Sequence, residues 1–163
     1  MKHTISILVE NHAGVLARVA GLFARRGFNI DSLAVGVTED EKISRITIIA
    51  DGTAYTLEQI EKQLNKLIDV IKGRHLPAEE LLSRELVLIK VACQPSQRAE
   101  LISLAEIAKA KISDITVNTM TLELSDSVPR IKTFEELLRP YGIKETVRTG
   151  SIAMQKGGAS MKL

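Results

Sequence analysis

The chain has 163 residues, 45% of them hydrophobic, which is enough for one ordinary domain or two small ones with packed cores. Its 22 basic and 20 acidic residues are dispersed and aromatic residues make up only 3%, which argues against nucleic-acid binding. The single cysteine, Cys93, rules out a disulfide framework and is expected to be a buried, inert thiol. No signal, transit or membrane-spanning pattern is evident, so we expect a cytoplasmic protein without membrane association.

The first half of the chain alternates strand and helix patterns. Residues 3–10 alternate apolar and polar side chains, as in a strand covered on one face. Apolar residues then recur at helical spacing, and Gly27 closes this helix near Arg26 in the left-handed conformation. Residues 29–38 and 42–51 are rich in β-formers and are separated by turn-forming residues, which predicts a hairpin. The residues that recur at helical spacing are Val15, Leu16, Val19, Leu22 and Phe23.

A second helix and a weaker fourth strand complete this half. The spacing of Thr56 and Gln59 predicts a capping box at the helix start. Residues 69–76 are expected to form the fourth strand. The buried stripe of the helix is predicted to be Leu57, Ile60, Leu64, Leu67 and Ile68.

The same order of patterns then repeats, so both halves are predicted to be βαββαβ. The fold class is therefore α+β, with two tandem ferredoxin-like sandwiches. We expect a first domain over residues 1–77, a linker over 78–83, a second domain over 84–154 and a flexible Gly/Lys-rich tail over 155–163. The second half is read as strand 85–94, helix 98–110, strands 111–119 and 120–126, helix 129–140 and strand 143–154.

In such sandwiches the helices cover one sheet face, so the other face or an edge strand must be paired. A homodimer is therefore predicted. The side chains expected on the second face are Leu8, Ile49, Leu88 and Val117.

The stretch from Glu10 to Gly14, ENHAG, lies between the first strand and the first helix. The unpaired N–H groups at the helix start and the positive end of its dipole form a small anion site, which suits a carboxylate. Gly14 would allow close approach to the backbone, and Asn11 offers both a donor and an acceptor. The alternative is purely structural, with Asn11 as helix cap and Gly14 as turn residue. Asn29 is likewise explained by its place at a strand start.

No catalytic set is found in the sequence. The phosphate-binding glycine motifs and the GxSxG nucleophile elbow are missing. His3, His12 and His75 have no cysteine or carboxylate at metal-ligand spacing, so no metal site is predicted. Residues distant in sequence can still assemble a site.

One extended pattern resembles a known family. The pattern consists of Asn11, Gly14, Leu16, Arg18, Gly21-Leu22-Phe23, Arg26-Gly27, Asn29-Ile30, Ser32-Leu33 and Arg45-x-Thr47-Ile48. It closely resembles the small regulatory subunits of acetolactate synthase, also called acetohydroxyacid synthase. The resemblance covers both halves and implies an N-terminal ACT domain followed by a second ferredoxin-like domain.

The resemblance implies a non-catalytic protein with no cofactor of its own. Family members activate a separate large catalytic subunit, which carries thiamine diphosphate, magnesium and FAD, and they confer feedback inhibition by L-valine. Their ACT domains associate side by side as a homodimer with the amino acid between them. On that model Asn11 and Gly14 of one protomer and Asn29 of the other hold valine. The other expected effector-site residues are His12, Ala13, Val15, Leu16 and Ile30.

Other readings stay open at this point. The main alternative is a free-standing ACT-type amino-acid sensor with a different client enzyme. A tandem ferredoxin-like enzyme or RNA-binding module is a third class, although RNA binding would require strand aromatics. Position 17 is alanine where some family members have serine, so a hydroxyl contact to the effector at this position would be missing. The second domain could dock on the large subunit, dimerise, or do both.

Overall fold

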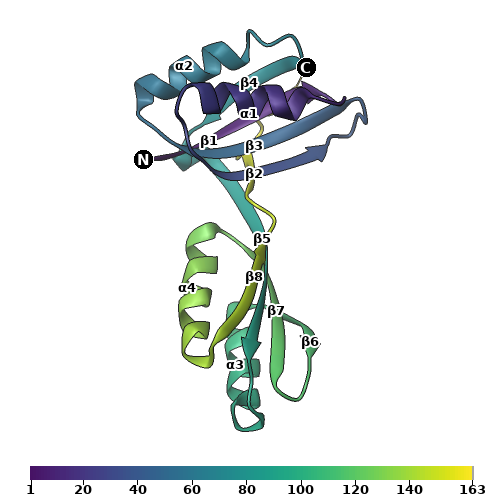
Figure 1. Cartoon of the computed structure of the whole chain (residues 1–163), viewed down its shortest axis with the longest axis vertical. Helices are drawn as coiled ribbons and strands as arrows, with labels where there is room; N and C mark the ends of the chain where they lie inside the picture. Colours follow the sequence, from purple (N-terminus) through teal and green to yellow (C-terminus); the bar gives the residue numbers. More distant parts are fainter. Residues whose placement is uncertain (163) are drawn as a thin grey trace. The chain divides into compact units, whose positions relative to one another are not determined.

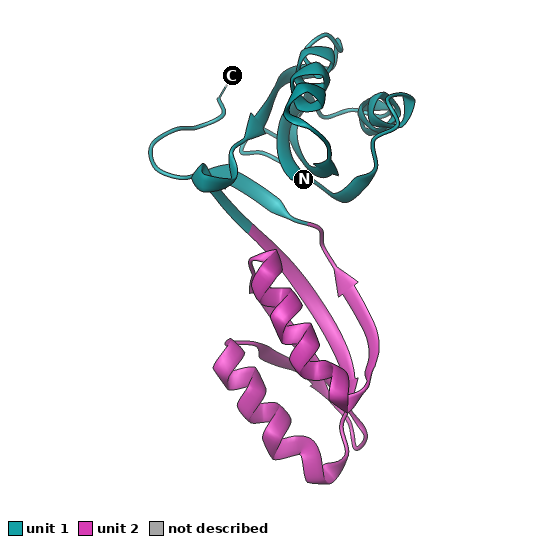
Figure 2. Cartoon of the chain, turned by 90° about the vertical axis from the view of Figure 1, so that its left-hand side faces the viewer, with its two compact units in different colours: residues 1–83, 151–163 teal, residues 84–150 magenta. Residues whose placement is uncertain are grey.

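Figure 1 shows the computed structural model of the chain, which describes residues 1–162. The chain divides into two compact units (Figure 2). Unit 1 comprises residues 1–83 together with the segment that begins at Ser151, and unit 2 comprises Arg84–Gly150. No helix within residues 1–162 is both long enough and apolar enough to cross a membrane.

Unit 1 is an antiparallel sheet with two helices on one face (Figure 1). The strand order is β2-β3-β1-β4. Every second residue of β1 points to the helices, so Ile5 and Ile7 pair across the sheet with Ile48 and Ile46 and are almost fully buried. The elements are β1 (Lys2–Glu10), α1 (Val15–Arg25), β2 (Ile30–Val37), β3 (Ile43–Asp51), α2 (Ala54–Leu64), β4 (Val70–Leu76) and η1 (Ala78–Glu80).

Unit 2 repeats this arrangement with strand order β6-β7-β5-β8. Its separate core includes Val87, Ile89, Leu101 and Phe134, and Cys93 is fully buried there, as predicted. The predicted α+β class with two βαββαβ sandwiches is thus confirmed. The elements are β5 (Leu81–Ala92), η2 (Pro95–Gln97), α3 (Arg98–Ala108), β6 (Lys111–Ile115), β7 (Thr119–Asp126), α4 (Val128–Leu138), η3 (Arg139–Tyr141) and β8 (Ile143–Arg148).

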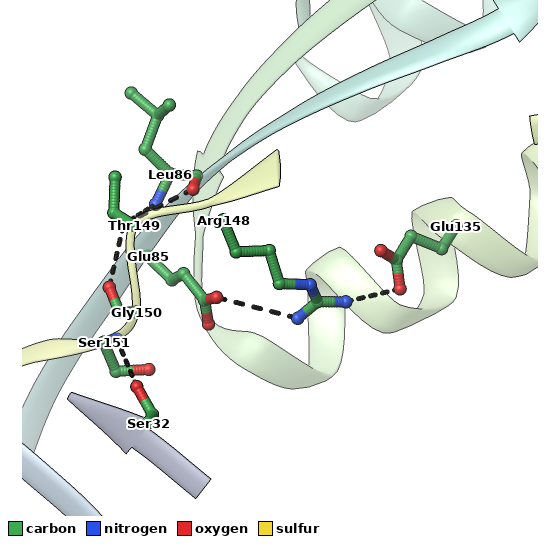
Figure 3. A network of polar contacts seen from close by, with 8 residues as sticks. All are labelled: Ser32, Glu85, Leu86, Glu135, Arg148, Thr149, Gly150 and Ser151. Carbon is green, nitrogen blue, oxygen red and sulfur yellow. Dashed lines mark hydrogen bonds and ion pairs between the residues drawn. The ribbon is translucent and has the colours of Figure 1, made fainter. Parts of the chain in front are cut away.

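An ion-pair network ties the last strand of unit 2 to its neighbours (Figure 3). Arg148 lies 3.7 Å from Glu85 of β5 and also donates to Glu135 of α4. Glu85 is only 6% exposed, so Arg148 compensates a buried carboxylate. Beside it, the Thr149 hydroxyl accepts a hydrogen bond of 3.1 Å from the backbone N–H of Leu86.

The last predicted strand, residues 143–154, is divided in the structure. β8 ends at Arg148, Gly150 adopts a positive φ of 81°, and β9 (Ile152–Gln155) follows and pairs with β5. The Ser151 N–H donates to the Ser32 hydroxyl at 2.9 Å, which holds the start of this segment on unit 1. The expected linker, residues 78–83, consists of η1 and the beginning of β5. The mobility predicted for residues 155–163 stays a prediction.

Some predicted buried positions are corrected. The N-cap of α2 is Thr53, whose hydroxyl accepts from the Thr56 N–H, so the capping box at Thr56 was wrong. Ile68 lies beyond the end of α2 and is 88% exposed. Val117 lies in the turn between β6 and β7 instead of on a sheet face. Leu8 is buried on the helix-free face of the unit 1 sheet, whereas Leu88 is partly exposed.

Candidate functional site

The loop between β1 and α1 is held by the neighbouring turns of unit 1. The Asn11 backbone N–H donates to the Lys42 carbonyl and its side-chain amide donates to the Glu41 carbonyl, both at 2.8 Å. The Glu10 N–H donates to the Asp69 carbonyl at 2.9 Å. Asn11 therefore anchors the loop to the β2–β3 turn and does not cap α1, which removes the structural alternative of an Asn11 N-cap.

Gly14 is the N-cap of α1 and adopts a φ of 90°. This left-handed conformation favours glycine, and a Cβ atom at this position would meet nothing within 4 Å. The approach to the helix start is therefore open. No side chain caps α1, and its first turn contains no acidic residue. The N–H groups and the dipole of α1 can consequently act on an external anion.

A charged cluster lies beside this helix start. The His12 Nε2 atom lies 2.9 Å from Asp69 and 3.3 Å from Glu10, and Arg18 of α1 also contacts the Asp69 carboxylate. Asp69 is only 6% exposed. The pKa of His12 is raised above its usual 6.5, chiefly by the Ala13 carbonyl next to Nδ1. Desolvation lowers this pKa, and the carboxylates of Asp69 and Glu10 raise it further. The buried Asp69 carboxylate therefore holds His12 of the β1–α1 loop and Arg18 of α1 together.

Sequence reasoning missed this cluster. The sequence spacing around His12 predicted no metal site, but in the fold the carboxylates of Glu10 and Asp69 lie beside His12. Asp69 precedes β4, far from His12 in sequence, and only the pairing of β1 with β4 brings them together. Glu10, His12 and Asp69 each place a possible metal-ligand atom within 4.8 Å of the others. Because Arg18 already compensates Asp69, this arrangement suits an ion-pair network.

The remaining predicted site residues differ in their surroundings. Ala13 is exposed, and Leu16 is 42% exposed beside the loop, whereas Val15 is 3% exposed and belongs to the core. Val15 therefore faces away from an effector at the loop, and Leu16 is the apolar side chain available there. Ile30 packs partly against the core.

Asn29 lies on the exposed surface just before β2, which forms one edge of the sheet. Its side-chain amide donates to Asp31 at 3.0 Å. Within residues 1–162 no hydrogen bond joins Asn29 to the loop of residues 11–16 of the same chain.

Comparison with known proteins matches both units. Residues 5–72 match the model of the AHAS small subunit-like ACT domain, and residues 84–157 match that of the small subunit of acetolactate synthase. Probable acetolactate synthase small subunits of Archaeoglobus fulgidus and Methanothermobacter thermautotrophicus are 49% and 50% identical. The matches cover 96% and 98% of this chain and 98% and 95% of those proteins.

A solved structure agrees with this result. The crystal structure of the acetolactate synthase small subunit from Thermotoga maritima matches with a TM-score of 0.90 and 38% identity. The match covers 98% of this chain and 99% of that one. The chain therefore belongs to the family of acetolactate synthase small regulatory subunits, and its unit 1 is an ACT domain.

Proposed function

We propose that this protein binds and activates the large catalytic subunit of acetolactate synthase in the cytoplasm and makes it sensitive to L-valine. The reacting groups, with thiamine diphosphate, magnesium and FAD, would belong to the large subunit, and this chain would hold no cofactor. The observation that carries the valine site is the start of α1. It is uncapped by side chains, begins at Gly14 with φ 90°, and has no acidic residue in its first turn.

In this proposal the α1 start binds the valine carboxylate and amide groups bind its ammonium group. Asn11 lies in the loop, although its Nδ2 is used by the Glu41 carbonyl, so its amide oxygen is the acceptor that can face the ammonium. Asn29 of the second protomer, just before its edge strand β2, would be the other amide group. Leu16 offers an apolar contact for the isopropyl group.

A site shared by two protomers also gives a mechanism for feedback. Valine can shift the equilibrium between two dimer arrangements only by the difference in its affinity for them. A coupling free energy of about 1–3 kcal/mol is typical of allosteric proteins and corresponds to a several-fold or larger change in activity. We expect valine to favour the arrangement that activates the large subunit poorly.

The test is reconstitution with the large subunit of the same organism. Acetolactate formation is measured with and without this chain and across a valine titration, for the parent, Gly14→Asp and Gly14→Asn. Aspartate and asparagine have similar side chains and must adopt the same left-handed backbone at position 14. Only aspartate places a negative charge beside the ligand carboxylate. We expect Gly14→Asp to retain activation and to need at least tenfold more valine for inhibition, with a smaller change in Gly14→Asn.

Unchanged valine inhibition in Gly14→Asp would refute the placement of the carboxylate. A chain that binds valine in calorimetry but never raises acetolactate formation would instead favour a free-standing amino-acid sensor. Loss of valine binding in Asn29→Ala, measured with the purified chain, would support the second half of the site.

A further inference from the structure

A cavity lies on the helix-free face of the unit 1 sheet, opposite the side that α1 and α2 cover. It has a volume of about 800 Å³. Its floor comes from three adjacent strands, and residues from Met154 to Lys162 form its other wall. The strand register places Ser6 of β1 beside Arg74 of β4 and Leu8 of β1 beside Arg45 of β3. The two arginines therefore flank β1 on the face of the cavity.

Two residues that line this cavity each carry a buried polar atom without a hydrogen-bond partner in the described chain. These atoms are the Ser6 hydroxyl, on a residue that is 0% exposed, and the Nε atom of Arg45. Arg45 makes one long contact of 3.5 Å from its guanidinium to the Met161 carbonyl. Within residues 1–162 neither Arg45 nor Arg74 pairs with a carboxylate. Buried donors are normally satisfied, so these groups point to a missing acceptor.

The lining selects the chemical class of that acceptor. Two guanidinium groups and a hydroxyl suit an oxyanion, because arginine presents several donors in a fixed fork. Around them lie the apolar side chains of Leu8, Ile43, Leu76 and Met154. The acidic residues Glu39 and Asp40 also line the cavity and oppose a multiply charged anion.

We infer that this cavity is a second ligand site, separate from the loop of residues 10–14, and that it binds a small organic monocarboxylate with an apolar body. The carboxylate would lie between Arg45 and Arg74 and accept from the Ser6 hydroxyl. The apolar body would lie against Leu8 and Leu76. The segment after β9 would cover the ligand.

The test is a residue-resolved NMR titration of the full chain with sodium isobutyrate. Two comparison probes separate the contributions: isobutyramide keeps the shape without the charge, and inorganic phosphate keeps an oxyanion without the apolar body. We expect saturable shifts of the Ser6 and Leu8 amides with isobutyrate, and binding at least tenfold weaker with either comparison probe.

Variants tie the binding to the arginines. Arg74→Gln, at an exposed position of the edge strand β4, and Arg45→Gln should each weaken isobutyrate binding at least tenfold. Arg26→Gln, an exposed arginine after α1, is the matched control and should leave it unchanged. Arg74 is exposed, so Arg74→Gln keeps the test valid even if Arg45→Gln unfolds.

Any of three results would overturn the inference. The isobutyrate-induced shifts could be confined to residues 10–16, Arg74→Gln could bind isobutyrate as tightly as the parent, or binding could fail to saturate at millimolar isobutyrate. Tighter binding of phosphate than of isobutyrate would overturn the assigned ligand class.

Discussion

The two units have the same strand order but begin their first helices differently. In unit 1, α1 follows Gly14 with no side-chain cap and no acidic residue in its first turn. In unit 2, α3 continues from η2, where Gln94 and Gln97 form a reciprocal capping box, and Glu100 lies in its first turn. A hydrogen bond to Glu100, assisted by desolvation, raises the pKa of Tyr141 to about 12, which shows that this carboxylate is engaged within unit 2.

No side chain caps α1 or α3, so the two helix starts differ in the charge of the first turn and in the capped η2 that precedes α3. The capping box satisfies the N–H groups of Gln94 and Gln97 at η2, and Glu100 places a negative charge in the first turn of α3, where it complements the helix dipole from within the chain. An external anion gains little there. The same groups of α1 remain for a ligand, so an effector site is expected in unit 1 and not at the equivalent place in unit 2.

The largest expected effects come from matched truncations in the two cores. Leu22→Ala on α1 and Leu101→Ala on α3 should each lower the free energy of unfolding by about 2–5 kcal/mol. Hydrogen exchange resolved by residue measures the loss separately for each unit. Leu16→Ala, at a 42% exposed position of α1, should cost about 0.5 kcal/mol. Equal loss of protection in both units from either truncation would show that they do not unfold separately.

A smaller effect is expected at the ion-pair network of unit 2. Arg148→Ala leaves the buried Glu85 carboxylate with one cationic partner fewer and should cost about 1–3 kcal/mol of unfolding free energy. Urea denaturation measures the difference. Lys90→Ala is the control, because Lys90 and Glu145 are exposed and 3.9 Å apart, a pair expected to contribute about 0–1 kcal/mol. Equal costs for the two variants would contradict the role given to Arg148.

Gln97→Ala removes the capping box at η2, which precedes α3. Loss of the reciprocal cap should cost about 0.5–1 kcal/mol of unfolding free energy, measured by urea denaturation. We expect no valine binding at α3 in this variant. The valine site at α1 depends on Gly14 and on the neighbouring loops, and removal of the Gln97 side chain does not create these features at α3. Valine-induced NMR shifts at residues 94–100 of the variant would break the comparison.

The smallest effect is a pH dependence confined to the loop of unit 1. Because the pKa of His12 is raised, the pairing of protonated His12 with Asp69 is complete below the ordinary pKa of 6.5 and is lost as the pH rises through the folded-state pKa. NMR titration of His12 should give a pKa above 6.5 that falls in Asp69→Asn. Glu10→Gln should lower it less, since Glu10 is the more distant partner. A His12 pKa insensitive to Asp69→Asn would contradict the assigned pairing.

The fold could be predicted because its elements follow local patterns. Alternation in β1 and helical spacing in α1 place Ile7 and Leu22 on buried faces without knowledge of the rest of the chain. The division of residues 143–154 into two strands was missed because the alternating pattern continues through Gly150. That glycine was the available signal, and its positive φ marks the break.

The candidate site could be predicted only in part. Its polar loop and helix start are adjacent in sequence, so spacing alone made Gly14 and Asn11 candidates. Asp69 and its contact with Arg18 depend on strand pairing, which no local pattern reports. Val15 was assigned to the effector because it is apolar and close to Gly14, but the helical phase turns it into the core.

Unit 1 is built from two pieces of chain that are separated by the whole of unit 2. During synthesis from the N-terminus, the ribosome releases residues 1–83 well before the segment that begins at Ser151. The core beneath α1 and α2 can therefore form early, whereas the face that carries Ser6 and Leu8 receives its covering residues only after unit 2 has been made. The nascent ACT domain consequently passes through a stage in which that face is open.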